Sequence, residues 1–365
     1  MKDFKTILVE YNKVDLAKRK AAVATVVRVR GSSYRSPGAR MLITDDGRWV
    51  GSISGGCLEG DALRKARQVM IDNKPTLVTY DTNEDSNQNL GIGLGCNGII
   101  DVLIEPAANA VGLYNSIVNI QQPVALATVF SGTSLGEKIL ISDIVATSDP
   151  ILQELSSLFV TRTSYTKELV HNGEAVEVFL ELIQPGIRLI IFGGGFDARP
   201  VSQLAKSLGW DVEVTDECAA HIAPLFFPTA DKLSLCQRQF IDRDFKINPY
   251  TACVLMSHNY EYDRDVLKKL VNTSTPYIGI MGPRKRFDKM LKDGVQLSEG
   301  QMNRIHSPIG LDIGAEAPDE IAVAIISEIQ ARFSNRNGGF LRNRNGAIHR
   351  RDETTDEVYK QVYLE

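Results

Sequence analysis

The chain has 365 residues, with 41 Lys plus Arg against 45 Asp plus Glu, so its formal net charge at pH 7 is −4. Hydrophobic residues make up 43% and charged residues 24%, a composition typical of a folded protein of two or three domains. The acidic balance argues against nucleic acid as the main partner, because neutralising phosphates needs a basic surplus. Apolar runs such as Ile321 to Ile326 fall short of the roughly 20 residues of a membrane span.

The N-terminal residues and the cysteines favour a cytoplasmic protein. Charged side chains interrupt the first ten residues, so they do not resemble a secretory signal. The chain has five cysteines, an odd number without CxxC spacing, and we therefore expect free thiols rather than disulfides or structural zinc. These cysteines are Cys57, Cys96, Cys218, Cys236 and Cys253.

The first part of the chain, residues 1–184, is predicted to form a mixed α/β domain. Two of its apolar strands carry a carboxylate and end at proline, DVLIEP at 101–106 and VFLELIQP at 178–185. Hydrophobic periodicity and turn signals predict the other elements. In chain order they are a helix at 3–20, strands at 22–29, 41–43 and 49–53, a helix at 57–73, strands at 77–80 and 99–104, a helix at 111–120 and strands at 124–129 and 138–141.

Residues 186–334 show a more regular alternation of strands and helices, which predicts a doubly wound parallel sheet of the Rossmann type. The remaining residues, 335–365, form a basic and then acidic tail. Its basic part is typical of a solvated extension, although docking on the acidic body or on an anionic ligand stays open. The predicted elements are strands at 188–192, 211–215, 252–256 and 277–281 and helices at 197–208, 263–271 and 318–333.

A glycine motif follows the first strand of this second domain. Gly193, Gly195 and Ala198 fit the pattern G-x-G-x-x-A, in which the glycines permit a tight turn and close approach of a phosphate, and the alanine permits close helix packing. Asp216 ends the next strand, where a carboxylate can accept ribose hydroxyls. The pattern predicts an NAD(P) or other nucleotide site; the alternative is a Rossmann domain without a dinucleotide.

Two segments after other strands of this domain also carry polar residues at the edge where ligands bind in doubly wound sheets. His258 follows the strand at 252–256, and Arg284 follows the strand at 277–281. A surface histidine and a basic helix start are the alternatives. Neither residue alone identifies a reaction.

A loop at residues 31–41 combines hydroxyls, glycines and two arginines. Arg35 and Arg40 offer planar donors, and Gly38 lets backbone approach an anion, so the loop suits a phosphate. An ordinary surface loop has a similar composition. The sequence predicts an anion site here without identifying the anion.

Two glycine-rich segments each contain one cysteine. A cysteine at the start of a helix is favoured as thiolate, which is the nucleophilic and metal-binding form. The alternative is that each cysteine is a small buried hydrophobe. The candidate residues are Ser54, Gly55, Gly56, Cys57 and Glu59 in the first segment and Gly95 and Cys96 in the second.

Together these segments resemble the XdhC/CoxI family, the accessory factors of molybdenum hydroxylases such as xanthine dehydrogenase. The resemblance covers nearly the whole chain, with the motifs in family order. The segments that carry it are GSSYRSPGARMLITDDGRWVGSISGGCLEGD (31–61), GLGCNGIIDVLIEP (93–106), RLIIFGGGFDARPVSQLAKSLGWDVEVTD (188–216), MSHNYEYDRDVL (256–267), YIGIMGPRKR (277–286) and RIHSPIGLDIGAEAPDEIAVAIISEI (304–329).

The resemblance implies an XdhC/CoxI domain followed by a Rossmann-like domain, and a chaperone without independent turnover. Such a protein binds molybdenum cofactor (molybdopterin), supports its sulfuration and inserts it into an apo-hydroxylase. It also implies a homodimer, and a cysteine desulfurase is a further candidate partner. Arg35 and Arg40 would then bind the cofactor's phosphate, with Cys57 or Cys96 near the metal. Two other hypotheses stay open, an NAD(P)-dependent oxidoreductase and a nucleotide-sensing regulatory protein.

Overall fold

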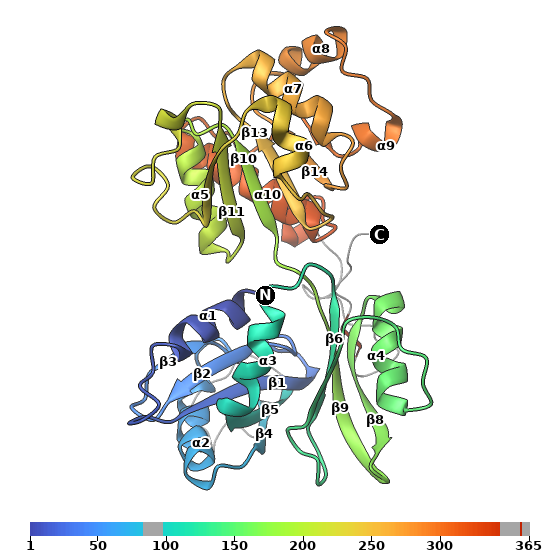
Figure 1. Ribbon diagram of the computed structural model, residues 1–365. Helices are drawn as coiled ribbons and strands as arrows, with labels where there is room; N and C mark the ends of the chain where they lie inside the picture. Colours follow the sequence, from blue (N-terminus) through green and yellow to red (C-terminus); the bar gives the residue numbers. More distant parts are fainter. Residues whose placement is uncertain (83–97, 344–357, 360–365) are drawn as a thin grey trace. The chain divides into compact units, whose positions relative to one another are not determined.

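The computed structural model describes residues 1–82, 98–343 and 358–359. The chain divides into two compact units, Met1–Pro185 and Gly186–Arg344, and two described residues near the C-terminus also pair with the first unit (Figure 1). Unit 1 is a mixed α/β structure and unit 2 contains a parallel sheet. The predicted fold class is confirmed.

Sheet A of unit 1 has the strand order β3-β2-β1-β5-β4, and all neighbouring strands are antiparallel. Residues of both faces of β1 are buried, because α2 packs on one face while α1 and α3 pack on the other. Because both faces are buried, the sequence of β1 is a nearly continuous apolar run rather than an alternating one. The elements are α1 (Lys2–Tyr11), β1 (Ala21–Gly31), β2 (Arg40–Thr44), β3 (Trp49–Gly51), α2 (Glu59–Asp72), β4 (Thr76–Asp81), β5 (Gly98–Pro106) and α3 (Ala108–Ile117).

Sheet B of unit 1 is also antiparallel, with the order β16-β8-β9-β6-β7, and α4 covers it. Its elements are β6 (Val124–Val129), β7 (Lys138–Ile141), α4 (Pro150–Thr161), β8 (Ser164–His171), β9 (Glu174–Ile183) and β16 (Val358–Tyr359). Ion pairs that join sheets A and B explain two of the carboxylates noted in the apolar strands, Glu105 with Lys138 and Glu181 with Arg40. A third such pair is Arg28–Glu177.

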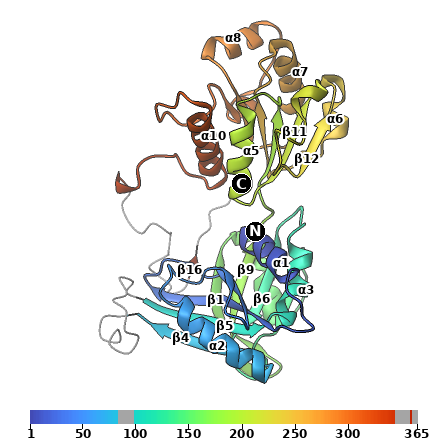
Figure 2. The same cartoon turned by 90° about the vertical axis from the view of Figure 1, so that its left-hand side faces the viewer.

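Unit 2 is built on a parallel sheet with the order β12-β11-β10-β13-β14-β15, which is 3-2-1-4-5-6 when counted within the unit (Figures 1 and 2). Helices α5 and α10 pack on one face, and α6, α7 and α8 pack on the other. The order reverses between β10 and β13, where ligands bind in this fold. Its longer helices are α5 (Ala198–Ser207), α7 (Tyr260–Leu270), α8 (Arg284–Lys292) and α10 (Pro318–Phe333).

The remaining elements of unit 2 are short. They are β10 (Arg188–Phe192), β11 (Asp211–Asp216), β12 (Lys232–Leu235), α6 (Ile241–Asp244), β13 (Thr251–Leu255), β14 (Tyr277–Ile280), α9 (Glu299–Met302) and β15 (Ile305–His306). No helix of the described residues has both the length and the apolar character needed to cross a bilayer. The cysteines described in the two units are all free thiols, as expected.

Candidate functional site

Strands β1, β3, β4 and β5 of unit 1 begin or end on one side of sheet A, which we call the loop edge. β1 and β4 end at this edge and β5 begins there, because Gly31 pairs with Gly98 and Asp81 pairs with Ile99. β3 ends beside the start of β2, on the same side of the sheet. The loops after β1, after β3 and after β4 therefore leave the sheet together.

The first two loops are in contact. The ring of Tyr34 lies against Gly55, where an added Cβ would come within 3.4 Å of the ring. At Gly98 an added Cβ would come within 2.2 Å of the Ser32 carbonyl oxygen, so this register requires glycine. Gly95 and Cys96, predicted for the third loop, lie outside the described residues.

Cys57 lies at the loop edge, two residues before α2 begins at Glu59. Its side chain is half-buried and packs on the apolar core between sheet A and α2. Its Sγ lies 3.5 Å from Ser54 Oγ. Gly56 beside it has a φ of +114° and open space around its Cα, so a ligand can approach the backbone here.

The other described cysteines differ in reactivity. Burial raises the pKa of the Cys253 thiol to about 12 and that of the Cys236 thiol to about 11. Both thiols are therefore protonated and unreactive at neutral pH. Cys218 is exposed, in the loop after β11 of unit 2. These three cysteines belong to unit 2. Among the described residues, Cys57 is the cysteine of unit 1, and its side chain is partly exposed.

Unsatisfied polar atoms lie in the loop after β1. Ser33 is 8% exposed, and its hydroxyl has no hydrogen-bond partner among the described residues. The same holds for Nε of Arg35, whose Nη2 donates to Asp3 at 2.6 Å. Buried polar groups are normally paired, so these two atoms are candidates for binding a ligand or water. The sequence singled out Arg35; the hydroxyl content of the loop was the signal for Ser33.

Arg40 points into the interior of unit 1. Its Nη1 donates to the Gly38 carbonyl at 2.6 Å, and Nη2 donates to Glu181 at 2.5 Å. The guanidinium also lies over the rings of Phe4 and Tyr114. Only 2% of Arg40 is exposed. The structure therefore does not bring this guanidinium and Cys57 to one surface, and Gly38 packs on the same buried pair.

In unit 2 the glycine motif sits at the carboxyl edge of the sheet. Gly193 has a φ of +118° and approaches the backbone of Ser257, so a side chain does not fit there. Ala198 begins α5 and is fully buried, as the motif requires. Asp216 Oδ2 accepts the backbone N–H of Gly194 at 2.9 Å, and Oδ1 accepts that of Cys218 at 2.8 Å. Asp216 thus fixes the glycine loop to β11.

His258 and Arg284 take different positions at this edge. The ring of His258 is exposed beside Gly195, and its Nε2 lies 3.3 Å from Asp197 Oδ2. Arg284 is exposed at the start of α8, and its Nη1 donates to the Ser307 carbonyl at 3.1 Å. The structure therefore brings Gly193, Gly195, Asp216 and His258 together. Arg284 instead donates a hydrogen bond to the loop after β15.

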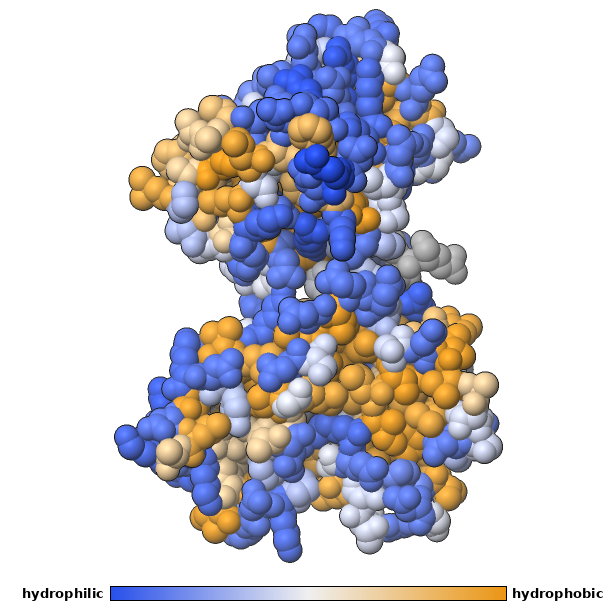
Figure 3. All heavy atoms as spheres, viewed as in Figure 1, coloured by the Kyte–Doolittle hydropathy of each residue, from blue (hydrophilic) through white to orange (hydrophobic). Residues whose placement is uncertain are grey.

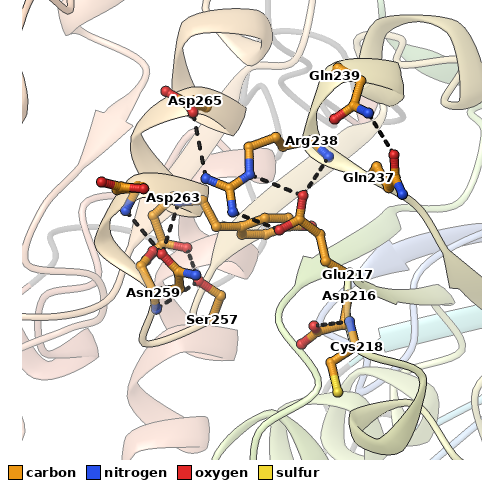
Figure 4. A network of polar contacts seen from close by, with 12 residues as sticks. Asp216, Glu217, Cys218, Gln237, Arg238, Gln239, Ser257, Asn259, Asp263 and Asp265 are labelled. Atoms are coloured by element: carbon orange, nitrogen blue, oxygen red, sulfur yellow. Dashed lines mark hydrogen bonds and ion pairs between the residues drawn. The ribbon is translucent and has the colours of Figure 1, made fainter.

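A polar network that the sequence did not reveal fixes the same edge (Figure 4). Arg238 binds both carboxylate oxygens of Glu217, at 3.0 and 2.7 Å, and also faces Asp265 of α7 at 3.6 Å. These hydrogen bonds from Arg238 lower the pKa of Glu217 below its ordinary value. The pair holds the loop after β11 against the segment after β12, and both charges are neutralised there.

We expect Asp216→Asn to destabilise the protein by about 1 to 3 kcal/mol, because an amide nitrogen cannot accept one of the two backbone N–H bonds. Urea unfolding of a Trp49→Phe background, in which Trp210 fluorescence reports on unit 2, measures the change. Asp197→Asn is the control, since that carboxylate faces an exposed imidazole, and we expect a loss below about 0.5 kcal/mol. Equal losses in the two variants would contradict this role of Asp216.

The described residues contain no group of three or more His, Cys, Asp and Glu side chains able to hold a metal ion. A thiol at the loop edge with unsatisfied polar atoms nearby can instead contact a preformed ligand. Such a site combines one soft group with hydrogen-bond donors.

Comparisons with known proteins give one consistent result. The model of the XdhC and CoxI family matches residues 16–81, and the model of the XdhC Rossmann domain matches residues 189–329. A probable xanthine dehydrogenase subunit of Bacillus subtilis (strain 168) is 33% identical over 313 residues, covering 85% of this chain and 92% of that protein. The molybdenum cofactor insertion chaperone PaoD of Escherichia coli (strain K12) is 25% identical over 332 residues, 90% of this chain and 88% of PaoD.

A solved structure is also similar. It is a crystal structure described as a xanthine dehydrogenase from Bacillus halodurans, with 30% sequence identity and a TM-score of 0.75. The match covers 92% of this chain and 97% of that chain.

Proposed function

The chain belongs to the XdhC and CoxI family, and on that premise we propose that it is an accessory chaperone of a molybdenum hydroxylase. In this role it binds molybdenum cofactor, supports its sulfuration and hands it to an enzyme of the xanthine dehydrogenase type. The similarity to PaoD, a molybdenum cofactor insertion chaperone, supports the proposal. The sequence predicted the same family.

The loop edge of unit 1 is the observation that carries the proposal. Molybdopterin presents a phosphate and a metal held by sulfur, so its site needs anion donors and a soft or protic group. Arg35 and Ser33 offer unsatisfied polar atoms, and Cys57 offers the thiol. We assign Arg35, Gly55, Gly56 and Cys57 to cofactor binding, and we propose that Gly95 and Cys96 complete the site.

The carrier must release its cargo, which favours contacts that break easily. Hydrogen bonds and a thiol near the metal meet this requirement better than a permanent metal–sulfur bond. We therefore propose proximity between Cys57 and the metal. Arg40 is left to the interior, where both of its Nη atoms are engaged by Gly38 and Glu181.

The surface of unit 1 supports a protein partner. Apolar residues occupy much of the face of unit 1 that Figure 3 shows, over β6 and α4. Exposed aliphatic side chains around α4 include Ile144, Val160 and Val170. Apolar surface of this kind marks protein interfaces, and we propose the apo-hydroxylase as the partner. A cysteine desulfurase, a homodimer and a cytoplasmic location are proposals supported by the family resemblance.

The crevice of unit 2 gives less support to NAD(P). Asp216, the residue expected to accept ribose hydroxyls, already accepts two backbone N–H groups. We propose that this crevice takes a phosphate-bearing group on the glycine loop beside His258. Catalytic hydride transfer has no further support there.

Reconstitution of an apo-hydroxylase tests the proposed function. Apo-xanthine dehydrogenase is mixed with molybdenum cofactor in the presence or absence of this protein, and xanthine oxidation is measured over time. We expect faster and fuller activation with the protein present. A second arm supplies cofactor without its sulfido ligand, together with a cysteine desulfurase and cysteine. Activation equal to that with cofactor alone in both arms would overturn the proposal.

A further inference from the structure

The aromatic ring of Tyr34, in the loop after β1, has one face covered and the other open. An added Cβ at Gly55 would lie 3.4 Å from Cγ of this ring, 3.6 Å from Cδ1 and 3.7 Å from Cδ2. Because the distances to the two Cδ atoms are nearly equal, this point lies over the flat of the ring rather than beside its rim. The glycine therefore supports one face. Tyr34 as a whole is 68% exposed, so the opposite face is open to solvent.

The loop beneath the ring is fixed by hydrogen bonds on both sides of Gly55. The buried carboxylate of Glu59, at the start of α2, accepts the backbone N–H of Ser54 at 2.9 Å. The hydroxyl oxygen of Ser54 accepts the backbone N–H of Gly56 at 3.2 Å. The support under Tyr34 is thus ordered before any ligand binds, which lowers the entropic cost of binding.

Polar atoms without a partner flank Tyr34 in the chain. Its neighbours Ser33 and Arg35 each have a buried polar atom that is unpaired among the described residues, the Ser33 hydroxyl and Arg35 Nε. Ser33 is 8% exposed. On the other side of Gly55, an added Cβ at Gly56 would meet nothing within 4 Å. An aromatic face, unsatisfied polar atoms and open space beside the backbone therefore occur together, and they suit a flat ligand with polar edges.

We propose that Tyr34 is a stacking platform for the bicyclic ring of a pterin and determines the ligand selectivity of the loop edge. Flat nitrogen heterocycles stack on tyrosine, and this contact depends on the aromatic face of the ligand rather than on its charge. It therefore also acts on a pterin that carries neither metal nor phosphate. That the pterin belongs to molybdenum cofactor rests on the proposed function, whereas the stacking does not. The contact holds the organic part of the cargo and leaves the metal end free to react.

Binding of biopterin, a fluorescent pterin without metal or phosphate, tests this role on the intact chain. Fluorescence anisotropy measures the dissociation constant, and quenching of the bound pterin reports contact with the ring. We expect Tyr34→Leu to raise the dissociation constant about tenfold and to abolish the quenching, because one aromatic stack is lost. Tyr34→Phe keeps the ring and should stay within about twofold of the native value.

Trp49→Leu is the matched control, because Trp49 is also exposed but lies on β3 in a separate hollow with Glu10 and Lys13. We expect it to bind biopterin like the native protein. Equal urea midpoints of the native protein and the Tyr34 variants show that the fold is kept, as expected for an exposed side chain. Native affinity in Tyr34→Leu would overturn the proposal, and so would absence of biopterin binding to the native protein.

Two comparisons with the reconstitution assay separate this proposal from the proposed function. If Tyr34→Leu binds biopterin normally but associates less with apo-xanthine dehydrogenase, the ring contacts the protein partner and the stacking proposal is wrong. If the native protein binds biopterin through Tyr34 but does not activate the apo-hydroxylase, the stacking site stands and the proposed function fails.

Discussion

Arg40→Met should destabilise unit 1 by about 3 to 5 kcal/mol, the largest loss of stability that we expect from a single substitution here. The side chain of Arg40 is 3% exposed and that of Glu181 is 14% exposed, so the variant leaves a carboxylate buried without its cation. The stacking of the guanidinium on Phe4 and Tyr114 is lost too. Urea unfolding of a Trp210→Phe background, in which Trp49 reports on unit 1, measures the change.

Two controls give this result its meaning. Arg35→Met breaks a partly exposed pair with Asp3 and should cost less than about 1 kcal/mol. The double variant Arg40→Met with Glu181→Leu removes both charges and should recover most of the lost stability, because apolar side chains can replace a buried pair. A loss below about 1 kcal/mol for Arg40→Met alone would contradict a structural role and return Arg40 to the candidate cofactor residues.

The role of Arg40 shows what the local sequence could and could not reveal. Within the loop at 31–41, Arg35 and Arg40 have the same chemistry, and both were predicted to bind an anion. The difference comes from Glu181, which lies on β9, 141 residues away in sequence. A carboxylate inside the apolar segment VFLELIQP was the available signal, since a buried charge requires a partner. The identity of that partner depends on how sheets A and B pack.

The parallel sheet of unit 2 was predictable because its central strands are buried on both faces and read as apolar runs. β10 occupies the predicted residues 188–192, and α10 occupies the predicted residues 318–333. The edge strands β12 and β15 were missed, because they are short and partly exposed and carry no such run. The opening helix ends at Tyr11 rather than near residue 20, and short hydrogen-bonded turns at Tyr11–Val14 and Asp15–Arg19 replace its predicted second half.

In unit 1, α4 was missed although the sequence marks its start. Asp149 caps the helix by accepting the Leu152 N–H at 3.0 Å, and Pro150 follows at the first helical position. The gathering of these strand ends at the loop edge was not readable in this way. It follows from strand register, such as the pairing of Gly31 with Gly98, which no local pattern encodes. The glycines and Cys57 were visible as a motif before their neighbours were known.

Cys57→Ser should lower the rate of cofactor loading into apo-xanthine dehydrogenase by about tenfold, equivalent to about 1.4 kcal/mol of lost interaction. Serine keeps a small side chain that can still donate to Ser54, so the turn before α2 is preserved. It lacks the polarisable sulfur, which is the group suited to a sulfur-bound metal. The reconstitution assay described for the proposed function measures the rate, and the dissociation constant of the cofactor complex measures the binding step.

Cys218→Ser is the matched control, because Cys218 is also accessible but lies in unit 2, outside the loop edge. We expect its loading rate to equal that of the native protein. Cys96→Ser then tests whether the third loop contributes to the same site. If the two cysteines contact one cofactor, the double variant Cys57→Ser with Cys96→Ser should lose less than the product of the single effects, since residues of one site are not additive. Equal loading by the Cys57 and Cys218 variants would exclude a thiol role at the loop edge, and the anion donors of the loop after β1 would then have to bind the cargo alone.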